Sequence, residues 1–163
     1  LEDHENKAPL LSIFGGKITT YRKLSEAAVN KLRPYFDTMS KAWTAEASLP
    51  GGDFIEQAQL VSELTQQFNF MTKQVLSRYV RSYGTLSYLI LNNANSIDDL
   101  GEHFGYGLYQ REVDYLIEQE WAVTAEDIMW RRSKLGLKLE ESQVHELEKY
   151  MEKKINNRFL KTA

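Results

Sequence analysis

Two adjacent glycines followed by a lysine and two threonines form the segment of this sequence best suited to chemistry. Gly15 and Gly16 follow an apolar run, and Lys17, Thr19 and Thr20 open a helical pattern that either threonine is suited to cap. Paired glycines allow a close backbone approach to a ligand, because they adopt positive φ without strain. The first N–H groups of a helix carry partial positive charge, and Lys17 adds a full charge. The segment therefore suits an anion or a developing anion.

The same pattern also describes an ordinary corner between a strand and a helix that binds nothing. The segment lacks the third glycine of a dinucleotide-binding fingerprint and the G-x-x-x-x-G-K-[ST] frame of a P-loop. Spacing alone leaves both interpretations open.

Other catalytic and metal-binding patterns are missing from the sequence. The three histidines, His4, His103 and His145, are far apart and form no H-E-x-x-H pair. With no cysteine, the chain has no thiol nucleophile, disulfide or thiolate metal ligand, and no G-x-S-x-G elbow occurs. We therefore expect no metal site.

Two charged clusters are interpreted as structural. Glu112 and Asp114, close to Arg111, do not share a helix face with it and are predicted to be a solvated surface. The cations of residues 130–136 (WRRSKLG) complement the dipole at the end of a short helix. They are suited to a phosphate, an anionic membrane or carboxylates of a neighbouring domain. We favour the alternative that they pair with nearby glutamates or pack against aromatic rings.

Composition and charge narrow the function classes. The chain has 163 residues, enough for one domain or for a domain with a piece of another. Its hydrophobic content of 42% predicts a folded chain, and its net charge of −3 argues against nucleic-acid binding. No apolar run approaches the ~20 residues of a membrane-spanning helix, and the charged first residues do not resemble a signal peptide. Since the sequence lacks an initiator Met and soon enters a strand that looks buried, we expect a fragment of a longer protein.

One strand and one helix are expected to position the glycine pair. The apolar run in residues 9–14 predicts a strand buried on both faces. The spacing of apolar residues predicts a helix over residues 20–33, which Pro34 ends or distorts. The segment Leu49-Pro50-Gly51-Gly52 is the strongest break in the chain, and we place a domain boundary there.

Beyond this break the pattern is almost wholly helical, so the predicted fold is mainly α. Residues 97–106 are expected to hold little regular structure, because glycines interrupt the pattern there and just beyond. The first expected helix begins at a capping box of Asp53 and Glu56, and the second begins at Thr72 and ends at Gly84. A short third helix is expected near Leu86, and a fourth begins at Tyr109 with Trp121 on its inner face. The fifth is capped by Thr124 and Asp127, and the last runs from Glu140 to Phe159.

Four segments resemble aerobic, FAD-dependent glycerol-3-phosphate dehydrogenases. The end of that family's flavin domain is similar to residues 14–24 (FGGKITTYRKL), and its interdomain junction is similar to residues 49–52 (LPGG). Its C-terminal helical domain is similar to residues 120–122 (EWA) and 130–136 (WRRSKLG). The segments follow the family's order and span most of the chain.

The resemblance implies a domain organisation. Residues 1–36 would be the C-terminal remnant of the FAD-binding domain, with its last strand and helix. Residues 37–52 would be a linker, and residues 53–163 an all-α C-terminal domain.

The resemblance also implies a reaction. Hydride passes from C2 of sn-glycerol 3-phosphate to N5 of FAD, giving dihydroxyacetone phosphate, and the electrons continue to membrane quinone. Gly15, Gly16, Ile18 and Thr19 would lie beside the isoalloxazine, where their amides would stabilise negative charge at N1 and O2. Lys17 would bind flavin or the substrate phosphate. No catalytic residue is expected in this chain.

The chain departs from the family because it has no Rossmann unit for the ADP half of FAD. We therefore expect the isolated fragment to be colourless and inactive, with the missing N-terminal FAD domain, glycerol 3-phosphate and quinone as partners of the whole enzyme. The implied location is the cytoplasm, peripheral on the inner face of the cytoplasmic membrane. Membrane contact through the basic last helix, and a homodimer, are further hypotheses.

Two alternatives stay open at this point. A glycerol-3-phosphate oxidase would share these segments but pass electrons to oxygen. A free-standing helical interaction domain would contain the Gly15-Gly16-Lys17 turn without any ligand.

Overall fold

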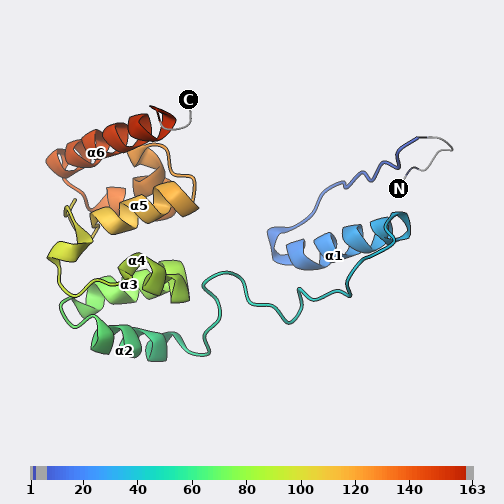
Figure 1. The fold of residues 1–163 in the computed structure, drawn as a ribbon, viewed down its shortest axis with the longest axis horizontal. Helices are drawn as coiled ribbons and strands as arrows, with labels where there is room; N and C mark the ends of the chain where they lie inside the picture. The colour runs from blue at the N-terminus through green and yellow to red at the C-terminus, as the bar shows by residue number, and fades with distance from the viewer. Residues whose placement is uncertain (1, 3–6, 161–163) are drawn as a thin grey trace. The chain divides into compact units, whose positions relative to one another are not determined.

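The chain forms two compact units that meet in sequence between residues 49 and 50. The computed structural model describes residue 2 and residues 7–160, with the backbone alone for residues 157–160 (Figure 1). The first unit is Leu1–Leu49 and the second is Pro50–Ala163. The described part is mainly helical, as predicted. The boundaries proposed for a linker at residues 37–52 stay a prediction.

The first unit is built around one amphipathic helix. A 3₁₀ turn, Ile18–Thr20, leads into α1, Tyr21–Leu32, and a second 3₁₀ turn, Arg33–Tyr35, contains Pro34. These bounds confirm the helix predicted for residues 20–33 and the effect of its proline. Although α1 is amphipathic, it contains no buried residue.

The buried strand predicted for residues 9–14 is wrong for this chain. Leu10 forms only an isolated antiparallel bridge with Glu2, and residues 11–17 have no regular structure. Phe14 is 93% exposed. A strand needs neighbours that pair with its backbone and cover its apolar side chains, and the described residues supply no sheet beside this segment.

The second unit packs its helices around one hydrophobic core. α2 lies beside α3 and α6 lies beside α5, with α4 completing the layer that contains α3 (Figure 1). Leu64, Leu76, Leu116 and Leu147 are fully buried and come from four different helices. The helices are α2 (Gln57–Gln67), α3 (Lys73–Tyr83), α4 (Ser87–Leu91), α5 (Gln110–Gln119), a π-helix (Asp127–Arg132) and α6 (Glu141–Leu160), with 3₁₀ turns at Gly84–Leu86, Asp98–Leu100 and Leu135–Leu137.

Some helix ends follow the predicted capping chemistry. The Thr72 hydroxyl accepts a hydrogen bond from the Val75 amide, and Gly84 ends α3 with a positive φ. The capping box predicted for Asp53 and Glu56 is wrong. The Asp53 carboxylate accepts a hydrogen bond from the Thr85 hydroxyl instead, and α2 starts only after Glu56.

The end of α5 also differs from the prediction. Trp121, predicted on the inner face of this helix, lies beyond its end and is 82% exposed. Its φ of 57° reverses the chain, and the Ala122 amide then donates to the Leu116 carbonyl at 3.0 Å. Ala122 is fully buried, so the small residue enters the core in place of the indole.

The cap predicted before the π-helix is confirmed in detail. The Thr124 hydroxyl accepts from the Asp127 amide at 3.2 Å, and the Asp127 carboxylate accepts from the amides of Val123 and Thr124 at 3.0 Å each. These bonds, led by that from Val123, lower the pKa of Asp127 from its ordinary value of 3.8. A group with a lowered folded pKa stabilises the fold above its unfolded pKa and loses that contribution as pH falls through the folded pKa.

Asp127→Asn should therefore lower the free energy of unfolding by about 1 kcal/mol at pH 7, the usual value of a lost cap. The difference between wild type and variant should shrink as pH falls below 3.8, because the unfolded chain then binds a proton that the folded carboxylate takes up only at lower pH. Urea unfolding followed by circular dichroism from pH 7 to pH 3 measures both effects. Exposed Asp98→Asn is the control, and a difference for Asp127→Asn that is constant with pH would contradict this account.

Candidate functional site

The predicted anion segment begins with two glycines that both adopt positive φ. Gly15 has a φ of 75° and Gly16 a φ of 136°, as expected for a turn that only glycine enters easily. The 3₁₀ turn and α1 follow directly, so the first N–H groups of the helical segment, which have no intrahelical partner, lie at Ile18 and Thr19. The local backbone geometry is that of the predicted corner.

The threonine side chains of this corner do not form the predicted helix cap. Neither Thr19 nor Thr20 caps α1, since the Thr20 hydroxyl donates to the Lys17 carbonyl at 3.1 Å. Gly15, Gly16, Lys17, Ile18 and Thr19 are all exposed. An added Cβ at Gly15 would have no neighbour within 4 Å, so one side of the turn is open. The corner thus leaves open space beside Gly15 that the edge of a planar group could approach.

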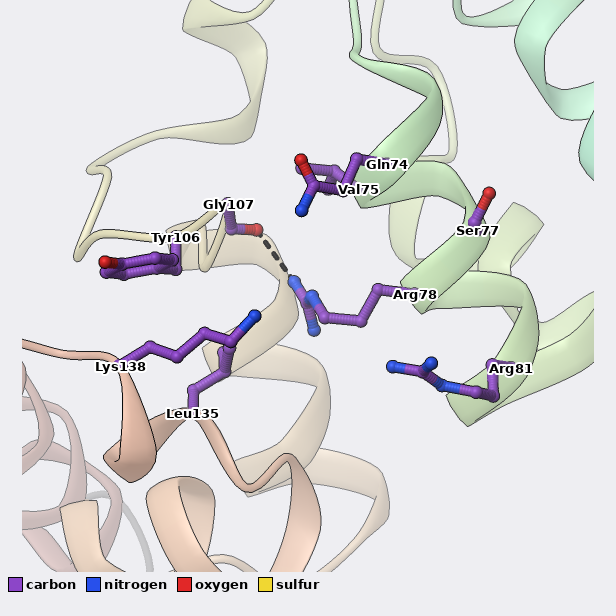
Figure 2. Close-up of a pocket in the computed structure, with 9 residues that line it drawn as sticks. All are labelled: Gln74, Val75, Ser77, Arg78, Arg81, Tyr106, Gly107, Leu135 and Lys138. Carbon is purple, nitrogen blue, oxygen red and sulfur yellow. Dashed lines mark hydrogen bonds between the residues drawn. The ribbon is translucent and has the colours of Figure 1, made fainter.

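A second candidate site, which the sequence did not indicate, is a cavity of about 600 Å³ in the helical unit. Residues of α3 line one side of it, and the loop before α5 and the turn after the π-helix line the other (Figure 2). Its lining consists of Gln74, Val75, Ser77, Arg78, Arg81, Tyr106, Gly107, Leu135 and Lys138.

A buried ion pair holds the wall of this cavity in place. Arg78 of α3 donates to both carboxylate oxygens of Glu112 of α5, at 2.5 and 2.6 Å. The same guanidinium donates to the Gly107 carbonyl at 2.8 Å, and the Tyr83 hydroxyl donates to Glu112 at 2.6 Å. The Glu112 side chain is fully buried, and three donor bonds therefore satisfy its charge.

The electrostatics of this network keep both Arg78 and Tyr83 protonated. Burial alone would lower the pKa of Arg78, but the hydrogen bond and charge of Glu112 outweigh it and raise that pKa. Burial, followed by the charge of Glu112, raises the pKa of Tyr83 well above its ordinary value. Arg78 therefore stays charged and the Tyr83 hydroxyl stays protonated across the physiological pH range.

The solvated surface predicted for Glu112 is wrong. The prediction considered only neighbours on the same helix, whereas the partners of Glu112 are 34 and 29 residues away in sequence. Spacing held a usable signal, because Glu112 lies four residues before buried Leu116 and so shares its inward face.

The structural interpretation of residues 130–136 is confirmed. Arg131 pairs with Glu126 at 3.1 Å and with Asp127 at 2.9 Å. Arg132 donates to the Glu120 carbonyl at 2.8 Å, and Lys134 donates to the carbonyl of Trp130. These cations hold the turns around the π-helix together.

Comparisons with known proteins extend over both units. Residues 42–155 match the family model described as the C-terminal domain of alpha-glycerophosphate oxidase. The chain is 50% identical over 145 residues to glycerol-3-phosphate dehydrogenase of Pseudomonas aeruginosa, covering 88% of this chain and 28% of that protein. It is 44% identical over 144 residues to aerobic glycerol-3-phosphate dehydrogenase of Escherichia coli (strain K12), covering 88% and 29%. It is 38% identical over 143 residues to D-erythritol 1-phosphate dehydrogenase of Brucella abortus, covering 86% and 28%. The chain thus spans less than a third of these relatives' length.

Glu112→Leu should lower the free energy of unfolding by about 3 kcal/mol, because it leaves the largely buried Arg78 without its counter-charge. The double variant Arg78→Met/Glu112→Leu should recover much of that loss, because no buried charge is then unpaired. Thermal and urea unfolding measure both, with exposed Glu118→Gln as the control. A single variant as stable as wild type would show that the pair does not hold the unit together.

Proposed function

The chain belongs to the family of C-terminal domains of alpha-glycerophosphate oxidase, and from that premise we propose that it is the C-terminal part of an FAD-dependent enzyme oxidising sn-glycerol 3-phosphate to dihydroxyacetone phosphate. The observation that carries this proposal is the 145-residue match to a glycerol-3-phosphate dehydrogenase at 50% identity. Residues 50–163 number only 114, so this match includes part of the first unit. A free-standing helical domain would not account for similarity there.

The exposed apolar side chains of the first unit support the same proposal. Phe14 and Ile18 are almost fully exposed, and Tyr21 and Val29 of α1 are about half exposed. Large apolar side chains left exposed along one segment suit a face that packs against other protein. We assign this face to a contact with the flavin domain of the whole enzyme, which residues 1–36 would complete.

Gly15, Gly16, Ile18 and Thr19 fit the role of flavin contacts in that enzyme. Their backbone lies at the start of a helical segment and is open to solvent, so their amides are available to a negatively charged ring edge. A bound FAD supplies the hydride acceptor. The amides and the helix dipole would stabilise negative charge on that ring, and Lys17 would hold the flavin or the substrate phosphate through its charge.

Electron transfer to quinone would place the enzyme at the inner face of the cytoplasmic membrane. Among the helices of the described residues, none combines the length and the apolar content needed to span a bilayer. A peripheral contact through α6 is supported by exposed Lys149 and Lys153, whereas Lys154 pairs with Asp114 at 2.8 Å. The side chain of Arg158, and Lys161, lie outside the described residues.

The membrane proposal predicts that the chain co-sediments with phosphatidylglycerol vesicles and is released by salt, because the attraction is electrostatic. Lys149→Gln/Lys153→Gln should reduce the bound fraction, and Lys73→Gln on α3 serves as the control. Equal binding by neutral phosphatidylcholine vesicles, or no binding at all, would contradict it.

A glycerol-3-phosphate oxidase is the second candidate function, because the matching family model is named for an oxidase. Such an enzyme would use the same flavin contacts and pass electrons to oxygen. The two candidates differ in whether substrate oxidation by the whole enzyme produces hydrogen peroxide or reduces a quinone analogue, and we favour quinone.

In the full-length enzyme, Lys17→Ala should slow flavin reduction by glycerol 3-phosphate about tenfold or more, the factor expected for one lost charge-assisted contact. Stopped-flow loss of flavin absorbance measures that rate, and peroxide and quinone reduction are followed in the same preparation. Exposed Lys23→Ala on α1 is the matched control. If both variants reduce flavin at the wild-type rate, Lys17 has no role at the flavin or the substrate phosphate.

A further inference from the structure

The lining of the cavity beside Arg78 is positively charged. Arg78, Arg81 and Lys138 line it, and no carboxylate is among its lining residues. The whole chain carries a net charge of −3, so this accumulation is not a product of basic composition. Glu112, which does not line the cavity, balances the charge of Arg78. Arg81 and Lys138 therefore leave an excess of two positive charges at the cavity.

The two excess cations have no carboxylate partner among the described side chains. Within the part of the chain that the structure describes, no ion pair joins Arg81 or Lys138 to an acidic side chain. Lys138 lies with its Nζ 5.8 Å from the centre of the Tyr106 ring. Figure 2 shows the Arg81 guanidinium and the Lys138 ammonium directed toward the same space from opposite sides of Arg78.

The loop that closes this cavity is held in an unusual conformation. Tyr106 has a φ of 46°, which is uncommon for a residue other than glycine. Gly107 follows with a φ of 74°, and a Cβ there would lie 2.4 Å from a Val75 methyl, so only glycine lets the loop approach α3 this closely. The bond from Arg78 to the Gly107 carbonyl fixes the loop. Such strain, retained by surrounding contacts, is concentrated at functional sites.

We propose that this cavity binds the phosphate group of a small phosphate monoester. A phosphate monoester carries about −1.5 to −2 charges at pH 7, which matches the excess of two cations better than a single carboxylate does. Guanidinium groups bind phosphate oxygens in a fork, and an ammonium adds a point charge. The volume of about 600 Å³ exceeds the needs of a phosphate ion, and Tyr106 and Leu135 offer apolar surface to an organic remainder.

All the lining residues of this site belong to the second unit, and the proposal does not depend on the proposed enzymatic role. Isothermal titration of the 163-residue chain with inorganic phosphate and with glycerol 3-phosphate tests it directly. We expect one site per chain that weakens as salt increases, and about tenfold weaker binding for Arg81→Gln and for Lys138→Gln. Lys73→Gln, an exposed lysine at the start of α3, should bind like wild type. Arg78 is left unchanged because it supports the fold.

Phosphatidic acid vesicles, compared with phosphatidylglycerol vesicles, distinguish a lipid phosphate monoester from a soluble one. Binding of either source that is lost in Arg81→Gln/Lys138→Gln supports the site and identifies its ligand. No binding of phosphate, glycerol 3-phosphate or phosphatidic acid would overturn the proposal. Equal affinity for acetate and phosphate, or unchanged affinity in a double variant with a normal thermal unfolding curve, would also overturn it.

Discussion

The buried pair of Arg78 and Glu112 is the interaction on which the helical unit depends. A carboxylate with no exposure to water is costly unless donors surround it, and here two guanidinium N–H groups and the Tyr83 hydroxyl do so. The same guanidinium also holds the carbonyl of Gly107. One side chain thus joins α3, α5 and the loop between residues 101 and 109.

The two units differ in how much of their apolar surface is buried within the described residues. The second unit has a buried hydrophobic core and pairs the buried carboxylate of Glu112 with Arg78, and its turns are held by the arginines of the π-helix. The first unit has a well-formed helix, α1, with no buried residue, and an apolar segment at residues 9–14 that forms no sheet. This contrast supports the proposal that the first unit completes a larger domain, whereas the helical unit has a core of its own.

Features set by neighbours in sequence were predictable, and features set by distant partners were not. The Thr124–Asp127 cap and the positive φ of the glycine pair follow from bonding and steric rules that span a few residues. The strand wrongly predicted for residues 9–14 would need partner strands, which the described residues do not supply. The burial of Glu112 depends on Arg78, 34 residues away, and the basic cavity requires three elements to meet. Sequence therefore located the candidate flavin corner but not the second site.

The central claim is that the unit organised by Arg78 and Glu112 folds alone, whereas the first unit needs contacts with a larger domain. Native-state hydrogen exchange of the 163-residue chain tests this claim most directly. Amides of α3 and α5 should show the strongest protection, and their exchange should require global unfolding. Amides of residues 9–17 should exchange at rates near those of an unstructured chain. Strong protection in residues 9–17, or exchange in α3 and α5 as fast as in α1, would contradict the account.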